Sequence, residues 1–408
     1  MIHLKEEYNK LLDIRFSTHE NWHSVQQEKV LPIFRQEIME FLDALSKKLQ
    51  TSSDIRNYPD LATFAFYCRK ANLNKLCKDY PVLVKSQLGR GITFHIAPSN
   101  VPMNFAYSLL MGMLAGNINI VRIPSKNYAQ IEVFLNALTS LQKEKIYKDA
   151  LAKVILVQYE RNKELTDFFS SICANRVIWG GDTTIAEIRK SPLAARSYDI
   201  AFSDRYSICI LGIESILDLD DMNNLANWFF NDTYLFDQNA CTSPHTIIWS
   251  GNRDKLSQAQ DRFWNAVSKL LHTKQYQLQA ATAVDKLTYA YEQIMDNKIV
   301  ELKTHENLIY RANLAYLKGE VFDSHSNCGY FNELFLEDLQ ELAVFLDSPK
   351  FQTISYFGVH PVDIETLILD NGLKGVDRIV PVGKTADFSA TWDGFDLIQN
   401  LSRNLTVN

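Results

Sequence analysis

From Gly91 onward the chain alternates between strand-like and helical segments, and this alternation restricts the possible fold more than any other feature. Strand-like runs at 92–97, 118–123, 154–157 and 176–179 are separated by helical stretches with short connections. Parallel strands need a crossover connection, usually a helix, whereas antiparallel strands can be joined by a tight turn. The sequence therefore predicts an α/β fold in which a parallel sheet is covered by helices.

Three loops follow strands of this predicted sheet and carry prolines, glycines and polar residues. They span 98–102, 124–126 and 180–184. In open α/β sheets, ligands bind outside the carboxyl ends of the strands. We therefore expect these three loops to lie at the ligand-binding edge.

The first 80 residues are predicted to be helical packing elements or an oligomer surface. Apolar residues recur at helical spacing from Leu31 to Leu49, and Pro32 suits the first turn of such a helix. A second helix is expected to start at Pro59.

The composition excludes several classes of function. The balance of 42 basic and 48 acidic residues gives a net charge of -6, which does not indicate a nucleic-acid-binding protein. No apolar run approaches the roughly 18 residues of a membrane span, and the charged start from Met1 to Glu7 does not resemble a signal peptide. The six cysteines lack metal-ligand spacing, so we expect free thiols, no metal and a cytoplasmic protein.

One of these cysteines stands in a loop that suits chemistry. Cys241 lies among small and amide residues in the stretch Asn231–His245, directly before Ser243 and Pro244. A thiolate nucleophile needs room for approach and nearby hydrogen-bond donors. The alternative is that Cys241 is a small buried core residue, which is the commoner role of a cysteine.

Four motifs, taken in their order, resemble the LuxC-type acyl-CoA reductases. This family comprises the fatty acid reductases of bacterial luciferase operons and their relatives, a branch of the aldehyde dehydrogenase superfamily. The resemblance extends from about Gly91 to Arg403. It rests on Asn100 within Pro98–Pro102, on Trp179–Asp182, on Gln238–Cys241, and on Asp377–Pro381 followed by Trp392–Gly394.

The resemblance implies an aldehyde dehydrogenase-like fold with a Rossmann-like cofactor domain and an α/β catalytic domain that carries the nucleophilic cysteine. The expected domains are an N-terminal helical segment (1–80), an NADP-binding domain (81–212) and a catalytic domain (213–374). A C-terminal segment (375–408) is expected to return to the active-site cleft. The lack of a GxGxxG motif fits, because aldehyde dehydrogenases bind their dinucleotide without it.

The same resemblance assigns catalytic roles to Cys241 and Asn100. Cys241 would attack the carbonyl carbon of an acyl thioester and carry the acyl group. Asn100 would hold the oxyanion together with the backbone N–H of Cys241, although an asparagine between two prolines also suits a simple turn. His245 is the better candidate for a proton donor or thiolate partner, whereas His95, inside a strand, is expected to be structural.

The cofactor-binding residues are expected at two of the loops. Arg122, Ser125 and Lys126 occupy the place where the superfamily meets the adenosine ribose, and its usual Lys-Pro-Ser-Glu pattern here reads Ile-Pro-Ser-Lys. Replacing that glutamate by a lysine favours the 2′-phosphate of NADPH over NADH, although a solvated basic strand end would look the same. The pyrophosphate is expected at the turn formed by Gly180, Gly181, Asp182 and Thr183.

Two further features bear on the substrate. Hydrolytic aldehyde dehydrogenases carry a Glu-Leu-Gly-Gly motif, and the corresponding segment 201–206 has no such glutamate, so an acyl-cysteine would be protected from water. Trp392 and Asp393 match the family signature and would line the substrate or nicotinamide cleft, or form a structural turn.

The resulting prediction is an NADPH-dependent reductase that converts a fatty acyl-CoA or acyl-protein thioester to the aldehyde. A homo-oligomer and an acyl-protein synthetase partner are implied by the family. Two alternatives remain: a CoA-acylating aldehyde dehydrogenase that oxidises short aldehydes, and a catalytically silent scaffold of the same fold.

Overall fold

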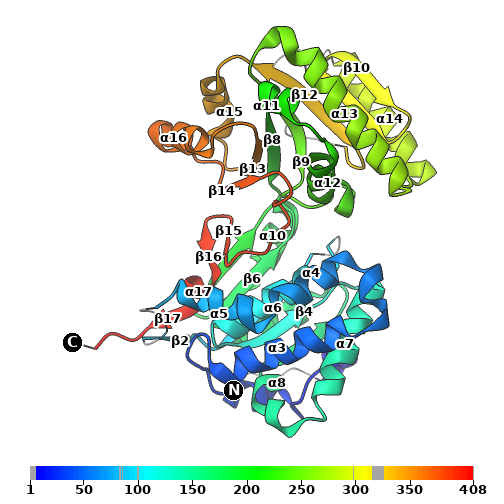
Figure 1. Ribbon diagram of the computed structural model, residues 1–408. Coiled ribbons are helices and arrows are strands. Elements are labelled where there is room, and N and C mark those ends of the chain that lie inside the picture. The colour runs from blue at the N-terminus through cyan, green and yellow to red at the C-terminus, as the bar shows by residue number, and fades with distance from the viewer. Residues whose placement is uncertain are drawn as a thin grey trace. The chain divides into compact units, whose positions relative to one another are not determined.

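The computed structural model describes residues 6–81, 84, 86–98, 101–296, 298–314 and 326–407, which form two compact units (Figure 1). The first unit comprises Met1–Ser203 and Phe388–Asn408, and the second comprises Asp204–Asp387. The second unit is therefore an insertion in the chain of the first. Its start lies before β8 (Tyr206–Gly212) rather than after residue 212, because β8 pairs with strands of the second unit.

The first unit is built on a six-stranded sheet of order β1-β5-β4-β3-β6-β7. The neighbours from β5 to β7 are parallel, which confirms the predicted sheet. The strands are β1 (Asp13–Phe16), β3 (Ile92–Ile96), β4 (Ile118–Arg122), β5 (Val154–Gln158), β6 (Asn175–Trp179) and β7 (Tyr198–Phe202).

Helices cover both faces of this sheet (Figure 1). Alternate strand residues serve opposite faces, as Ile120 and Val121 of β4 do. On one face lie α3 (Gln36–Gln50), α4 (Pro59–Tyr67), α6 (Asn104–Leu114) and α7 (Ala129–Leu141); on the other lie α2 (Trp22–Gln27), α9 (Lys163–Ile172) and α10 (Asp182–Ile188). The remaining helices of this unit are α1 (Glu6–Asn9), α5 (Lys70–Lys78), α8 (Lys148–Leu151) and α17 (Leu397–Asn400).

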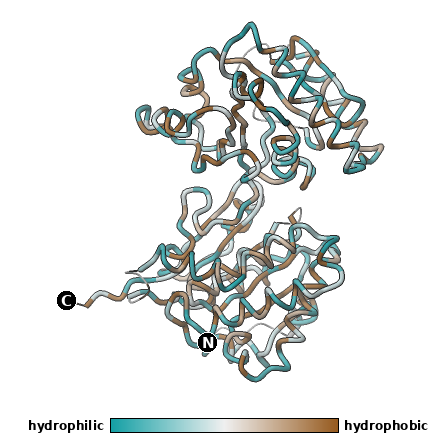
Figure 2. The backbone as a smooth tube through the Cα atoms, viewed as in Figure 1, coloured by the Kyte–Doolittle hydropathy of each residue, from teal (hydrophilic) through white to brown (hydrophobic). Residues whose placement is uncertain are grey.

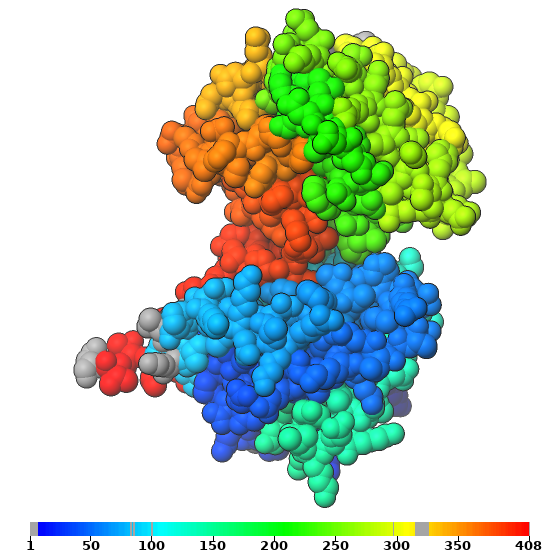
Figure 3. All heavy atoms as spheres, viewed as in Figure 1, coloured from blue at the N-terminus to red at the C-terminus, as the bar shows by residue number. Residues whose placement is uncertain are grey.

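The N-terminal region differs from the prediction in two places. Residues 13–16 form the edge strand β1, antiparallel to β5, because a four-residue strand is too short to stand out by alternation in the sequence. The first long helix begins at Gln36, not near Pro32, since Phe34 adopts a left-handed backbone with φ of 50° and Pro32 forms a β-bridge with Leu88. The predicted helix start at Pro59 is confirmed. In Figure 3 the atoms of α3, α4 and α5 cover much of the visible face of this unit.

The last residues of the chain complete the first unit. Strand β17 (Ser402–Asn404) pairs with β2 (Gln87–Gly89) in an antiparallel two-stranded sheet. Before it, β15 (Thr391–Trp392) and β16 (Phe395–Asp396) form a hairpin.

The second unit contains a seven-stranded sheet of order β10-β11-β12-β9-β8-β13-β14. Only the edge pair β10 and β11 is antiparallel. The strands after β8 are β9 (Pro244–Ser250), β10 (Ile299–His305), β11 (Ile309–Leu314), β12 (Tyr330–Leu336), β13 (Phe351–Phe357) and β14 (Arg378–Pro381). The antiparallel pair β10 and β11 follows a helix that ends at Met295.

Helices again cover both faces of the second sheet. The helices α11 (Ile213–Asp218), α12 (Asn223–Asp232) and α13 (Leu256–Thr273) pack on one face, and α15 (Ala343–Leu346) and α16 (Pro361–Asn371) pack on the other. Helix α14 (Ala280–Met295) packs on β10, β11 and β12. Figure 2 shows hydrophobic and hydrophilic residues alternating along these helices, as expected for helices with one buried face.

A buried polar cluster joins α6 to the first sheet. His95 accepts or donates through Nδ1 to Ser108 Oγ at 2.7 Å and through Nε2 to Asn119 Oδ1 at 3.0 Å. Gly112 of α6 faces this pair, and an added Cβ there would lie 1.9 Å from Asn119 Oδ1. His95 is fully buried, and burial lowers its pKa to about 4. The structure thus places His95 in a hydrogen-bonded core position.

This burial predicts a specific pH dependence of stability. Between the ordinary pKa of 6.5 and the folded value of about 4, the unfolded chain takes up a proton at His95 and the folded chain does not, so stability falls as pH drops. From pH 7 to pH 5 this loss amounts to about 2 kcal/mol. Urea unfolding at both pH values should show a smaller pH effect in His95→Asn than in wild type. The exposed-site control His23→Asn should retain the wild-type pH effect; an unchanged pH effect in His95→Asn would contradict the assignment.

Candidate functional site

The loops predicted to bind a ligand lie at one edge of the first sheet. The segments that follow β3, β4 and β6 leave the carboxyl ends of parallel strands that are direct neighbours. The strand order reverses direction between β3 and β6, and this kind of switch point is where such sheets bind ligands. Asn100 lies outside the described residues.

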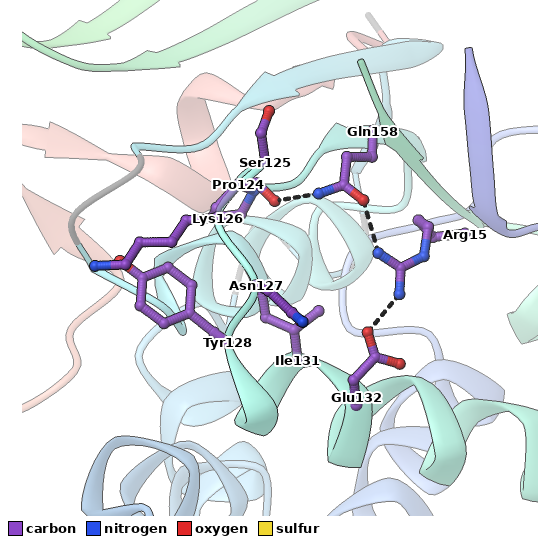
Figure 4. A pocket seen from close by; sticks show the side chains of 9 residues that line it. All are labelled: Arg15, Pro124, Ser125, Lys126, Asn127, Tyr128, Ile131, Glu132 and Gln158. Atoms are coloured by element: carbon purple, nitrogen blue, oxygen red, sulfur yellow. Dashed lines mark hydrogen bonds and ion pairs between the residues drawn. The ribbon is translucent and has the colours of Figure 1, made fainter. Parts of the chain in front are cut away.

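A pocket of about 290 Å³ lies beside the ends of β4 and β5 (Figure 4). It includes the predicted residues Ser125 and Lys126, and its volume is near the lower end of the roughly 300–1,000 Å³ typical of small-molecule pockets. The other lining residues are Arg15, Pro124, Asn127, Tyr128, Ile131, Glu132 and Gln158.

The edge strand β1 contributes an arginine to this pocket. Arg15 donates to Gln158 Oε1 at 2.7 Å and pairs with Glu132 Oε1 at 2.5 Å (Figure 4). The Glu132 carboxylate is therefore engaged by a cation. Lys126 Nζ lies 5.1 Å from the centre of the Tyr128 ring. The pocket thus combines two cationic side chains with one carboxylate that is already paired.

Arg122 does not line this pocket and contacts Tyr159 instead. Its guanidinium donates to the carbonyl of Tyr159 at 3.1 and 3.3 Å and lies 4.6 Å from the centre of the Tyr159 ring. These contacts anchor the end of β4 against the end of β5. Among the residues predicted at this strand end, the pocket is lined by Ser125 and Lys126 and not by Arg122.

The turn predicted to hold a pyrophosphate connects β6 to α10. Gly180 N donates to the carbonyl of Phe202 at 3.1 Å, and Gly181 precedes the first helical residue, Asp182. Asp182 and Thr183 are exposed to solvent. The turn is therefore open, with its backbone at the start of a helix.

Trp392 and Asp393 belong to the β15–β16 hairpin of the first unit. Asp393 and Gly394 have φ angles of 48° and 74°, the left-handed pair that a two-residue hairpin turn of type I′ requires. The Trp392 ring packs 5.7 Å from that of Tyr107 and 6.4 Å from that of Trp179. Asp393 thus has a turn-forming role, and Trp392 joins an aromatic cluster.

In the second unit, the loop before β9 is shaped by Gln238. This side chain is buried, and its Nε2 donates to the carbonyls of Pro244 and Tyr330, both at 3.2 Å. Its Oε1 accepts from the backbone N–H groups of Gly329 at 2.6 Å and Tyr330 at 3.2 Å. One amide therefore ties the loop to β9 and to the start of β12.

Cys241 lies in a tight turn at the end of this loop. Ser243 N donates to the carbonyl of Ala240 at 2.9 Å, and Ser207 Oγ of β8 donates to the carbonyl of Cys241 at 2.7 Å. The residue is partly exposed. Its Sγ accepts a hydrogen bond from Gln352 Nε2 of β13 at 3.4 Å. The sulfur is thus held on the edge of a buried sheet next to an amide donor.

His245 is the second residue of β9 and is 4% exposed. Its Nδ1 lies 3.2 Å from the carbonyl oxygen of Ser326, and its ring centre lies 5.7 Å from that of Tyr206. A ring nitrogen that contacts a carbonyl carries the proton, which leaves Nε2 as the acceptor when the ring is neutral.

The Asp377–Pro381 motif stabilises the edge of the same sheet that is formed by β13 and β14. Asp377 pairs with Arg205, whose guanidinium also bonds to the carbonyl of Phe351. Arg378 donates to the carbonyls of Thr385, Lys384 and Asp387 at 2.7–3.0 Å. The motif therefore holds strand ends and the following loop together.

Asp232, at the end of α12, binds the loop that follows β14. Its carboxylate accepts from the backbone N–H groups of Gly383 at 2.6 Å and Thr385 at 3.0 Å. Burial raises its pKa to about 6, although the two backbone donors oppose this shift.

Several of these residues were not predicted from the sequence. Arg15, Ser207, Asp232 and Gln352 lie far in sequence from the groups they contact, and none belongs to a recognisable motif. The Asp377–Pro381 motif could have pointed to Gln352, because the motif contains β14 and β14 pairs with β13, the strand that carries Gln352. Among the described residues, no group of three His, Cys, Asp or Glu side chains could hold a metal ion, and no described helix is long and apolar enough to span a membrane.

The hydrogen bonds of Gln238 give a testable expectation. Gln238→Ala leaves two buried N–H groups and two carbonyls without this partner, so stability should fall by about 2–4 kcal/mol in urea unfolding. Gln340→Ala, at an exposed position in the same unit, should change stability by less than about 0.5 kcal/mol. Equal effects of the two substitutions would show that Gln238 does not stabilise the loop.

Comparison with known proteins identifies the family of the chain. The sequence model of the family acyl-CoA reductase (LuxC) matches residues 78–404. A long-chain acyl-protein thioester reductase of Photorhabdus laumondii is 24% identical over 321 residues, which cover 76% of this chain and 62% of the relative. The matched part thus spans about three-fifths of the relative's length.

Solved structures agree on the fold. Methylmalonate-semialdehyde dehydrogenase from Oceanimonas doudoroffii has a TM-score of 0.65 at 12% identity, covering 95% of this chain and 91% of that chain. A 1-pyrroline-5-carboxylate dehydrogenase from Thermus, solved with bound NAD, has a TM-score of 0.62 at 12% identity, covering 94% and 82%. These identities establish the aldehyde dehydrogenase fold alone, as the sequence resemblance predicted. With the family match over residues 78–404, the chain belongs to the acyl-CoA reductase (LuxC) family.

Proposed function

We propose that this protein reduces a fatty acyl thioester to the aldehyde with Cys241 as the nucleophile. The observation that carries this proposal is the placement of Cys241, partly exposed on a tight turn with an amide donor 3.4 Å from its sulfur. The LuxC family and the named activity of the Photorhabdus relative support the reaction class.

In the proposed reaction the Cys241 thiolate attacks the carbonyl carbon of the thioester. The tetrahedral intermediate expels the carrier thiolate, which leaves an acyl-cysteine. The backbone N–H of Cys241 and the amide of Asn100 are the proposed donors to the oxyanion. After reduction of the acyl carbon, the bond between carbon and Sγ breaks, so that the aldehyde leaves and the thiolate is restored. His245 is the proposed group for proton transfer, since an imidazole ring can both accept and donate a proton.

Protection of the acyl-cysteine from water is part of the proposal. The segment from Ala201 to Tyr206 lacks a glutamate that could activate water. Within it, Arg205 pairs with Asp377 and bonds to the carbonyl of Phe351, which gives this segment a structural role.

The pocket next to β4 suits a phosphorylated ribose, and we assign it to NADPH. Lys126 and Arg15 supply positive charge, and Glu132 is already paired with Arg15. Ser125 adds a hydroxyl, and the turn at Gly180, Gly181, Asp182 and Thr183 is the proposed pyrophosphate contact. When bound, the reduced nicotinamide supplies the hydride. Arg122, which contacts Tyr159, contributes through the position of the strand end.

The acyl donor, acyl-CoA or an acyl-protein delivered by a synthetase partner, and a homo-oligomeric state also belong to the proposal. Trp392 is the proposed aromatic contact for the acyl chain or the nicotinamide, and Asp393 shapes its hairpin turn.

Removing the nucleophile tests the reaction. Cys241→Ser should lower the NADPH-dependent reduction of long-chain acyl-CoA by at least about 10³-fold, because a serine hydroxyl is a far weaker nucleophile than a thiolate. Cys328→Ser, at another partly exposed thiol of the same unit, should retain most of the activity. Near wild-type activity in Cys241→Ser would refute the mechanism. Assays in both directions with graded chain lengths would separate this reaction from oxidation of short aldehydes.

Reversing the charge at residue 126 tests the cofactor. Lys126→Glu should lower kcat/KM for NADPH relative to NADH by about ten- to a hundred-fold, because a carboxylate repels the 2′-phosphate and can accept from a ribose hydroxyl. The exposed-site control Lys143→Glu should leave the ratio unchanged. A constant ratio in Lys126→Glu would remove the assignment of this pocket to the 2′-phosphate.

A further inference from the structure

Gln352 of β13 contacts the sulfur of Cys241, although 111 positions separate the two residues. Its side chain is buried, at 2% exposure, and its Nε2 lies 3.4 Å from Sγ. A side-chain amide nitrogen can only donate, so the sulfur is the acceptor. A thiolate accepts such a bond more strongly than a thiol, and a bond to the charged form favours that form.

An irregularity in the sheet directs Gln352 toward this sulfur. In the ladder between β13 and β8, Phe351 pairs with Tyr206, and the next pair is Ile354 with Ile208. Two residues of β13, Gln352 and Thr353, therefore lie opposite the single residue between Tyr206 and Ile208. Bulges of this kind turn a side chain away from its regular direction and are frequent beside active sites.

The backbone around Gln352 is fixed on its other side. Asp377 N donates to the carbonyl of Gln352 at 2.9 Å, and Val376 N donates to the carbonyl of Phe351 at 3.0 Å. Arg205 pairs with Asp377 and bonds to the same Phe351 carbonyl. The Asp377–Pro381 motif therefore has a consequence for the nucleophile, because it holds the residue whose side chain meets Sγ.

Strand β8, which lies between β9 and β13, holds the backbone of Cys241. Ser207 Oγ of β8 donates to the carbonyl of Cys241 at 2.7 Å, while Gln352 reaches the sulfur from β13. Backbone and side chain of Cys241 are thus held by two neighbouring strands of one sheet. This arrangement limits the directions that Sγ can adopt and keeps the donor beside it.

We propose that Gln352 is a further catalytic residue, whose amide N–H stabilises the Cys241 thiolate before attack and again when the aldehyde leaves. This role rests on the proposed function of Cys241 as nucleophile. When Sγ bonds to the acyl carbon, the sulfur loses its negative charge and the hydrogen bond weakens. When that bond breaks, the charge returns to sulfur and the donor stabilises it.

The test measures the reactivity of Cys241 without any catalytic turnover. Iodoacetamide alkylation is followed as a function of pH by mass spectrometry of the peptide that contains Cys241, with Cys328 in the same sample as a reference thiol. In Gln352→Met, which keeps the length but loses the donor, the midpoint of the Cys241 profile should rise by about one pH unit. In Gln352→Glu, a carboxylate next to the sulfur should raise it further.

A buried glutamine away from the sulfur gives the matched control. Gln260 of α13 is buried in the same unit, and Gln260→Met should leave the Cys241 profile at its wild-type position. Reduction of acyl-CoA by Gln352→Met should fall about tenfold at pH 7, and the loss should shrink as the pH approaches 9, a recovery that a purely structural defect would not show.

The two proposals fail in different ways. An unchanged alkylation profile in folded Gln352→Met overturns the role of Gln352, and so does an unchanged profile in Gln352→Glu if the Met variant does not fold. Retained activity in Cys241→Ser instead overturns the proposed function and leaves the alkylation result standing as a property of the thiol.

Discussion

The loop that presents Cys241 depends on the buried amide of Gln238. Loops usually run over the surface, because their backbone groups need water or other partners. Here the side-chain amide of Gln238 donates two hydrogen bonds to backbone carbonyls and accepts two from backbone N–H groups. Asp237 and Gln238 also adopt left-handed backbones, with φ of 51° and 56°, at a cost of about 1–2 kcal/mol each for residues other than glycine. The four hydrogen bonds offset this strain and select one loop geometry.

The position of the sulfur then follows from defects in regular sheet pairing. Ser207 of β8 lies between two irregular strand pairings. On the β9 side, Ser207 pairs with Pro244 and Ile208 pairs with Thr246. On the β13 side, the pairing is interrupted by the bulge at Gln352. The strand residues without a partner in these ladders are His245 in β9, and Gln352 and Thr353 in β13. Regular pairing would alternate strand side chains strictly between the two faces. The irregularity on the β13 side instead brings the Gln352 side chain to the sulfur of Cys241.

The sequence was informative where a pattern repeats and uninformative where a contact joins distant residues. Strand and helix alternation identified the parallel sheet of the first unit, and Pro59 marked a helix start, because both depend on local chemistry. Strand β1 was missed, so Arg15 and its pair with Glu132 were missed with it. Gln352 looked like any polar residue in a strand, since its meaning depends on a bulge and on a partner 111 positions away. Arg122 was singled out by its charge alone, and the sequence could not show that its guanidinium contacts the carbonyl and the ring of Tyr159, so its part in cofactor binding stays a prediction.

A comparison of the thiols supports the proposal that Cys241 is the nucleophile. Burial raises the pKa of Cys173 and Cys209 to about 12 and also raises the pKa of Cys68, so these thiols stay protonated near neutral pH. Cys328 is partly exposed, but burial and the carboxylate of Asp237 raise its pKa as well. Exposure alone therefore does not make a thiolate in this protein. Cys241 combines partial exposure with an N–H donor held at its sulfur, and the bulge, the Arg205–Asp377 pair and the Ser207 hydroxyl all act to keep that donor and that sulfur together.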